Sequence, residues 1–245
     1  MSSASVYHVQ PYGTRSWSID ESFTRMFLLE GEDLALLIDT GLGTGDLLRE
    51  VSGLTEKPIL LANTHGDHDH CRNNHAFPQA YMHPADFCMY DKPGQAPCQL
   101  LPMWEGQTID LGGRVIEAIL IPGHTPGSLA YLDITNRELY GGDSVQNGTI
   151  FLFGSGRNPE TFLASLHKLW AQRDRFDRIY ASHGPLELDV DFIRQLIAYT
   201  EDVLAEKVPY ELTTAHNQVV RAYRQGLLTL LCPHTYHSVW PEFHG

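Results

Sequence analysis

Long apolar runs are missing from this sequence: no segment approaches the roughly 18–20 apolar residues that a membrane-spanning helix needs. The amino terminus, MSSASVYHVQPYG, has no basic segment followed by an apolar one, so we expect no secretory signal. Cysteine is also scarce, and Cys71, Cys88, Cys98 and Cys232 are irregularly spaced in a chain too large to need disulfides. These absences predict a soluble, cytoplasmic protein with reduced thiols and no membrane partner.

Positive charge is in short supply as well. The sequence has 17 Lys and Arg against 30 Asp and Glu, a formal net charge of −13. Because nucleic-acid binding usually rests on a basic surface, a nucleic-acid partner is not expected. The global charge says less about small substrates, since a bound metal can invert the local sign. Linkers, low-complexity tracts and short repeats are absent too, so residues 1–245 are interpreted as one domain.

Strands dominate the middle of the chain, with helices between groups of strands rather than in strict alternation. Apolar patterning and turn residues predict strands over 23–41 (a hairpin), 57–65, 113–144 (three strands), 177–184 and 219–232 (a hairpin turning at Gln225-Gly226). Helical spacing predicts helices over 43–54, 158–174 and 189–206. This order favours sheets that pack together and are covered by helices.

Side chains that can bind metals follow several of the predicted strands. The densest group lies in LANTHGDHDHCRNN (61–74), directly after an apolar run, and single residues follow other strands beside glycines. Loops at one end of a sheet can meet in a shared cleft, so these residues can be neighbours in space. The candidates are His65, Asp67, His68, Asp69, His70, His124, Asp143 and His183.

The motifs that contain these residues resemble those of the metallo-β-lactamase superfamily. That family has the series T-H-x-H-x-D-H, P-G-H-T-P-G, G-D and S-H-G, and this sequence has THGDHDH, PGHTPGS, GGDS and ASHG in the same order. The early IDTG (38–41) and the segment EGQTIDLGG (105–113) match as well. The resemblance covers about residues 24–190 and implies an α/β fold, the αβ/βα four-layer sandwich of two mixed β-sheets flanked by helices.

The resemblance also implies a dinuclear site for two divalent transition-metal ions. Imidazole and carboxylate ligands suit Zn, Fe or Mn. His65, Asp67 and His124 match the ligands of the first metal; Asp69, His70 and His183 match those of the second, and Asp143 matches the bridging ligand. Asp39 matches a residue that orients a ligand His by accepting a hydrogen bond from its other ring nitrogen.

Asp67 departs from the family pattern, which has His at this position. A carboxylate is a harder ligand than imidazole and adds a negative charge, which favours Fe or Mn and makes a bound water less acidic. The flavodiiron branch of the superfamily also has a carboxylate here, a Glu. The alternative interpretation is that Asp67 only forms hydrogen bonds nearby and that the site holds one metal.

Two neighbours of the cluster have their own alternatives. Using His68 as the missing ligand would break the match at Asp69-His70, so we place it outside the ligand set. It could reach the substrate or donate a proton, but a hydrogen-bonded loop His is the favoured interpretation. Cys71 is interpreted as a small packed residue, not as a thiolate ligand. His216 gives no grounds for a function.

The implied activity is hydrolysis of a small ester, thioester, lactone or amide by a metal-bound hydroxide at a dinuclear site. Asp69 would orient the nucleophile as well as bind the second metal. Small-molecule substrate contacts are expected from residues 72–107 and 144–157, which are variable loops in this superfamily. Two alternatives stay open: an iron-dependent redox enzyme related to the flavodiiron branch, and a non-catalytic protein that binds metal or ligand.

Overall fold

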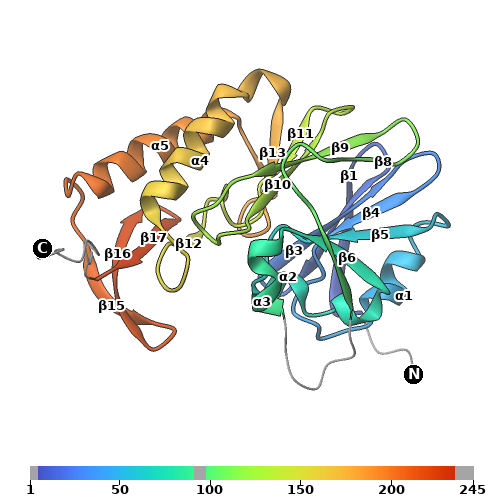
Figure 1. Ribbon diagram of the computed structural model, residues 1–245, viewed down its shortest axis with the longest axis horizontal. Helices are drawn as coiled ribbons and strands as arrows, with labels where there is room; N and C mark the ends of the chain where they lie inside the picture. Colours follow the sequence, from blue (N-terminus) through green and yellow to red (C-terminus); the bar gives the residue numbers. More distant parts are fainter. Residues whose placement is uncertain (1–4, 91–97, 235–245) are drawn as a thin grey trace, which may run out of the picture.

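The computed structural model describes residues 5–90 and 98–234, and its strands form three sheets (Figure 1). The first sheet is mixed and has the order β1 (Tyr7–Gly13), β2 (Ser16–Glu21), β3 (Thr24–Glu30), β4 (Ala35–Ile38), β5 (Ile59–Ala62), β6 (Gln79–Met82) and β7 (Gln99–Pro102). The second is also mixed and has the order β14 (Glu187–Leu188), β13 (Arg178–Tyr180), β11 (Glu138–Tyr140), β10 (Leu129–Asp133), β9 (Val115–Leu120) and β8 (Thr108–Asp110).

The helices lie outside these two sheets. Helices α1 (Leu47–Ser52), α2 (His68–Cys71) and α3 (Phe87–Tyr90) cover the seven-stranded sheet, and α4 (Pro159–Ala171) and α5 (Asp191–Leu204) cover the six-stranded one. Helix α4 begins as the sequence predicts, because Asn158 accepts a hydrogen bond from the Thr161 N–H at 2.6 Å and Pro159 occupies the first turn.

Alternating side chains build the layers. In β3, Met26 and Leu28 pack toward α1, whereas Phe27 and Leu29 pack between the two sheets. In β10, Tyr131 joins the same inter-sheet core while its neighbours face α4 and α5. Because both faces of these strands are buried, they are apolar throughout rather than alternating with polar residues. The predicted αβ/βα four-layer sandwich is confirmed.

A third, four-stranded sheet lies beside α4 and α5 and was not predicted (Figure 1). Its order is β12 (Thr149–Phe151), β17 (Leu228–Pro233), β16 (Gln218–Gln225) and β15 (Glu211–Ala215). The hairpin of β16 and β17 confirms the expected turn near Gln225-Gly226, with Gln225 paired to Leu228. The pairing of β12 with β17 joins segments almost eighty residues apart, which local sequence patterns cannot reveal.

One buried cluster joins the third sheet to helices α4 and α5. The single domain predicted from the sequence stays a prediction. Ile150, Tyr223 and Leu230 of the third sheet pack in the same buried cluster as Leu166 of α4 and Ile193 of α5. The other predicted helices and strands are confirmed with shifted ends, whereas the predictions omitted α2 and α3 and the strands β1, β2, β6, β7, β8, β12, β14 and β15. Residues 91–97 of the expected substrate segment 72–107 lie outside the described residues. Among the described residues, no helix is long and apolar enough to span a membrane.

Candidate metal centre

The predicted ligands gather where strands of both large sheets end. His65 follows β5, Asp143 follows β11 and His183 follows β13, while His124 lies in the turn between β9 and β10. His70 reaches the same place from the short helix α2. The chain thus brings together side chains from both sheets at one edge of the sandwich, as the sequence predicted.

The first group of donor atoms consists of His65, Asp67 and His124. The Nε2 atoms of His65 and His124 lie 3.2 Å apart. Asp67 Oδ2 lies 3.2 Å from His124 Nε2 and 3.6 Å from His65 Nε2. All three residues therefore direct one ligand atom to a common point, and Asp67 occupies the place that the sequence match gave it.

The second group consists of Asp69, His70 and His183. Asp69 Oδ2 lies 3.6 Å from His70 Nε2 and 3.4 Å from His183 Nε2, and the two imidazole nitrogens are 3.3 Å apart. Asp143 lies between the groups: Oδ1 is 3.1 Å from the Nε2 atoms of His70 and His183, and Oδ2 is 3.6 Å from His124 Nε2. This is the position of a bridging ligand.

These distances fit metal ions better than hydrogen bonds. Ligand atoms about 2.0–2.1 Å from a tetrahedral ion lie about 3.3–3.4 Å from one another, close to the spacings in both groups. Asp143 Oδ1 is buried and has no hydrogen-bond partner in the structure, although two imidazole nitrogens face it. A buried carboxylate oxygen without a partner is costly unless a cation occupies the space before it.

Each imidazole is fixed at its other ring nitrogen. The four Nδ1 atoms have four different partners, at 2.7–3.0 Å, so that every Nε2 is turned toward the cluster. The pairs are His70 with the Asp39 carboxylate, His65 with the Thr64 hydroxyl, His124 with the Phe151 carbonyl and His183 with the Phe23 carbonyl. The predicted partner role of Asp39 matches its 2.8 Å contact with His70.

Electrostatics place the Asp143 carboxylate in its anionic form. Burial raises the pKa of Asp143, but the charges of His183 and His70 outweigh burial and hold that pKa well below its usual range. Burial lowers the pKa of His70, but the charges of Asp143 and Asp39 outweigh it and raise that pKa well above its ordinary value. For His124, burial prevails and lowers the pKa. Without metal, the charge of Asp143 therefore favours the protonated form of His70 beside it.

Asp67 has a further partner that the sequence analysis missed. Arg157 donates from Nη2 to both Asp67 oxygens, at 2.6 and 2.8 Å. Both side chains are mostly buried, with 13% of Arg157 and 22% of Asp67 exposed. The expectation of an additional negative charge at Asp67 therefore left out a neighbouring positive charge. Nothing in the local pattern FGSGRNPE marks Arg157 as part of a site.

A second missed residue, Asp86, ties two ligand loops together. Its buried carboxylate accepts hydrogen bonds from the Gly66 N–H at 3.0 Å, the Gly127 N–H at 2.7 Å and the Thr125 hydroxyl at 2.6 Å. Cys71, by contrast, is packed as predicted: its thiol lies 3.1 Å from the Asp67 carbonyl, outside the two ligand groups.

The cluster opens onto a cavity of about 780 Å³. Phe23, Leu42 and Phe151 contribute apolar surface to its lining, and Asp69 lines it together with other candidate ligands. His68 is exposed and lines this cavity, with Nδ1 at 3.2 Å from the Arg72 guanidinium. The predicted catalytic role of His68 stays a prediction, since the residue can face a substrate but lies outside the ligand groups.

His216 also lines the cavity, which the sequence did not suggest. It lies at the turn between β15 and β16, and its ring stacks on Phe151 with 5.2 Å between ring centroids and 9° between planes. Phe151 thus has two functions, because its carbonyl holds His124 while its ring carries His216. Residues 149–157 of the expected substrate segment 144–157 contribute three of the lining side chains.

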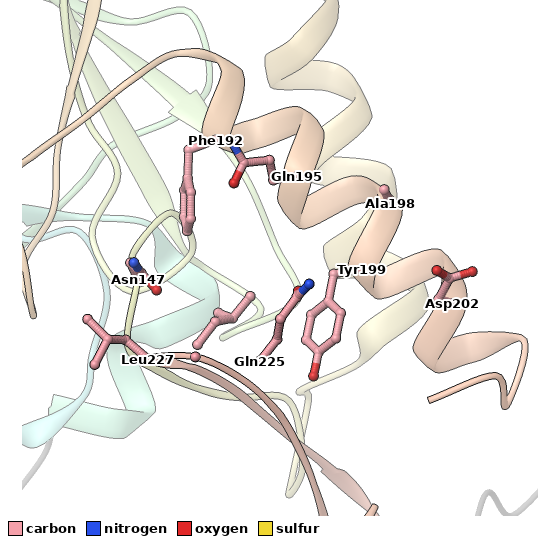
Figure 2. Close-up of a pocket in the computed structure, with 10 residues that line it drawn as sticks. Asn147, Phe192, Gln195, Ala198, Tyr199, Asp202, Gln225 and Leu227 are labelled. Atoms are coloured by element: carbon pink, nitrogen blue, oxygen red, sulfur yellow. The ribbon is translucent and has the colours of Figure 1, made fainter. Parts of the chain in front are cut away.

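Another cavity, of about 530 Å³, lies away from the candidate ligands (Figure 2). Helix α5 forms one wall with Phe192, Gln195 and Tyr199, and the turn between β16 and β17 forms another with Leu227. Its described lining shares no residue with the cavity at the cluster. It adds no acid, base or metal ligand to the candidate centre.

The four-layer sandwich and the two donor groups at its edge define a class of proteins with a candidate dinuclear metal centre. The model of the metallo-β-lactamase superfamily matches residues 19–183, more than half of the chain. The chain belongs to this superfamily.

Similar proteins agree with this membership. A hydroxyacylglutathione hydrolase of Synechococcus sp. (strain JA-2-3B'a(2-13)) is 27% identical over 164 residues, which cover 64% of this chain and 62% of that protein. The acyl-coenzyme A thioesterase MBLAC2 of Gallus gallus is 25% identical over 223 residues, which cover 71% of this chain and 79% of that protein. Several of the cyanobacterial relatives are matched over little more than half of their own length.

Solved structures show the same fold. A metallo-β-lactamase from Pontibacter korlensis has a TM-score of 0.69 at 14% identity and covers 80% of this chain and 99% of its own. The protein TTHA1623, solved in a di-iron-bound form, has a TM-score of 0.58 at 25% identity. The match covers 70% of this chain and 92% of TTHA1623.

Proposed function

We propose that this protein is a metal-dependent hydrolase of a small ester or thioester, with two divalent transition-metal ions (Zn, Fe or Mn) at the cluster. The observation that carries the proposal is the convergence of seven donor residues on two points at the base of a substrate-sized cavity. His65, Asp67 and His124 would hold one ion, Asp69, His70 and His183 the other, and Asp143 both. When bound, the ions would make a water acidic enough to be deprotonated near neutral pH and would polarise the substrate carbonyl.

The protein's own residues would perform the remaining tasks. Asp69 borders the cavity, so its carboxylate can accept a hydrogen bond from the attacking water and orient it toward a carbonyl carbon. His68, on the cavity wall, can donate a proton to the leaving group. Phe23 and Phe151 can shield the acyl group from water, because both side chains line the cavity.

Among the candidate substrates, we favour a thioester that places only an uncharged group in the cavity. The hydroxyacylglutathione hydrolase and acyl-coenzyme A thioesterase relatives support the thioester. The cavity supports the uncharged group: Arg157 is the one Lys or Arg among its described lining residues, and it is already paired with Asp67. A carboxylate on the substrate would find no unpaired Lys or Arg side chain among these lining residues.

The test compares two thioesters of one neutral acyl group, joined either to uncharged N-acetylcysteamine or to anionic glutathione. We expect hydrolysis of both after metal loading, with the higher kcat/KM for the N-acetylcysteamine thioester. Exhaustive chelation, verified by elemental analysis, should abolish both activities. Activity that persists without metal would contradict the mechanism, and inactivity toward both with two metals bound would contradict the substrate class.

An iron-dependent redox enzyme is the second candidate, favoured by the carboxylate of Asp67 and by the similar protein that was solved in a di-iron form. It requires iron in the purified protein and turnover with an external electron donor. Full hydrolytic activity with zinc alone would exclude it as the main activity. A small-molecule substrate, the lack of nucleic-acid and membrane partners, and a cytoplasmic location stay predictions from the sequence.

A further inference from the structure

Asp67 departs from the family motif, and the structure places an arginine on it. Arg157 binds both carboxylate oxygens through Nη2, while its Nη1 donates to the His124 carbonyl at 3.0 Å. Nη1 also lies 3.2 and 3.3 Å from the ring nitrogens of His124. A single guanidinium therefore contacts two of the three residues in the first donor group.

The backbone fixes where Arg157 lies. The Asn158 N–H donates to the Gly123 carbonyl at 2.9 Å, which holds the residue after Arg157 against the His124 turn. Gly156 has a φ of +75° and packs against Pro126 of the same turn, where an added Cβ would lie 2.4 Å from a proline carbon. The Arg157 loop and the His124 turn thus form one packed unit, so the guanidinium is held in place before any ion binds.

The charges of this unit cancel. Asp67 contributes one negative charge and Arg157 one positive charge, while His65 and His124 bind a metal as neutral imidazoles. The first donor group then has the same net charge as three imidazoles. Without Arg157, the carboxylate would add a full negative charge beside the ion, as the sequence alone suggested.

We propose that Asp67 and Arg157 together replace the second His of the family motif: Asp67 Oδ2 binds the first ion, and Arg157 cancels the charge of the carboxylate and fixes its orientation. This inference rests on the proposed metal centre. Arg157 is then a positioning residue for the first ion. The pair gives that site the preference for zinc of a three-imidazole site instead of a bias toward iron or manganese.

The experiment is a double-mutant cycle, read out as metal affinity rather than activity. Zinc and manganese are titrated calorimetrically into metal-free wild type, D67H, R157L and D67H/R157L, and elemental analysis gives the stoichiometry. D67H looks like a return to the family motif, but it leaves Arg157 unpaired beside the ion. We expect D67H to weaken zinc binding at the first site at least about tenfold, and D67H/R157L to recover to within about threefold of wild type.

R157L alone shows how the Asp67 carboxylate affects metal preference when its arginine partner is removed. We expect its ratio of zinc to manganese affinity to fall at least about tenfold, because an unpaired carboxylate favours the harder ion. Arg157→Lys keeps the charge and should keep the ratio within about threefold of wild type. D67H/R72L is the matched control, since Arg72 is a nearby arginine that contacts His68; it should bind zinc as weakly as D67H. Circular dichroism melting curves show that each variant is folded.

The outcomes separate this inference from the metal centre itself. If wild type binds fewer than two zinc ions, the metal centre fails and the inference fails with it. If wild type binds two but the effects of D67H and R157L simply add, or R72L rescues as well as R157L, only the Asp67–Arg157 unit is wrong. The inference is supported if R157L, but not R72L, restores zinc binding in the D67H variant. It also requires that R157L by itself lowers the preference for zinc over manganese.

Discussion

At the scale of single residues, the cluster depends on side chains that direct one polar atom to the cluster and use another in a hydrogen bond to the surrounding protein. Asp39 has a left-handed backbone, with φ of +65°, and its carboxylate accepts from the Thr64 N–H, the Thr64 hydroxyl and His70. A left-handed backbone is uncommon for residues other than glycine, although Asp and Asn tolerate it better than most. Asp39 therefore fixes the ring of His70 and the start of the His65 loop through the same two oxygens.

Removing the bridging carboxylate should disable both proposed sites. For Asp143→Ala we expect loss of at least one metal ion per chain and a fall in the rate of thioester hydrolysis of about a hundredfold or more, since each factor of ten corresponds to about 1.4 kcal/mol of transition-state stabilisation. Elemental analysis and steady-state kinetics measure these. Asp177→Ala is the control, because that carboxylate pairs with Arg137 on the exposed surface. Unchanged metal content in Asp143→Ala would refute the bridging role.

Metal binding should strengthen as the pH rises. The pKa of His70 in the metal-free protein is raised above its ordinary value of 6.5 by Asp143 and Asp39, against the effect of burial. The stability from this charged pairing is complete below the unfolded pKa and is lost as the pH rises through the folded one. Because metal displaces the proton, affinity falls as the pH falls. We expect the Tm difference between metal-loaded and metal-free protein to grow from pH 6 to 9; a constant difference would contradict this account.

At the scale of elements, the ligand loops are held by contacts between segments far apart in the sequence. Asp86, directly before α3, accepts from two backbone N–H groups and one hydroxyl on the loops that carry His65 and His124. The short strand β12 supplies the carbonyl that orients His124. These supports explain how loops, normally the most variable parts of a fold, can hold donor atoms at fixed spacing.

Asp86→Ala should destabilise the fold as well as the site. The substitution leaves the N–H groups of Gly66 and Gly127 buried without acceptors, at a cost of about 1–3 kcal/mol each. We expect a fall of about 2–5 kcal/mol in the free energy of unfolding, measured by urea titration of the metal-free protein. Asp174→Ala, whose side chain is 88% exposed, should change stability little. If the two substitutions lower the free energy of unfolding equally, the hydrogen bonds that Asp86 accepts from the two ligand loops contribute little to stability.

The sequence predicts best what is encoded within about fifteen neighbouring residues. Helix α4 is predictable because Asn158, Pro159 and a helical apolar stripe are adjacent, and the seven candidate ligands could be proposed because each lies in a recognisable short motif. Strand β12 has three residues, and its partner β17 lies almost eighty positions later. His216 reaches the site through that third sheet, and Arg157 reaches it because its loop packs against the His124 turn, so no local sequence pattern predicts either residue.

At the scale of the whole molecule, the candidate ligands come from both large sheets. His65 and His70 extend from the seven-stranded sheet, and His124, Asp143 and His183 from the six-stranded one. Metal bound at this edge would therefore connect the two halves of the sandwich. A ligand that binds only the folded state stabilises it by about 4 kcal/mol at a thousand times its dissociation constant.

Removing metal should consequently lower the melting temperature. For a chain of this size, about 4 kcal/mol corresponds to a shift of roughly 8–16 °C. Scanning calorimetry of metal-loaded and chelator-treated protein measures the shift, and re-addition of zinc should reverse it. His167→Ala is a useful control, because this exposed residue of α4 pairs with Glu201 and should leave the metal-dependent shift intact. Identical melting curves with and without metal would show that bound metal does not connect the two sheets.

The pairing of β12 with β17 has a consequence for the order in which the protein is made. All seven candidate ligands are synthesised by residue 183, but the strand that pairs with Thr149–Phe151 is not synthesised until residues 228–233. Chains generally begin to fold from the amino terminus during synthesis, and pairings distant in sequence form late. The nascent chain therefore carries every donor atom before strand pairing fixes β12, the strand whose carbonyl accepts the hydrogen bond from His124. Metal captured at that stage would bind an unfinished first site, and completion of the last hairpin would tighten it.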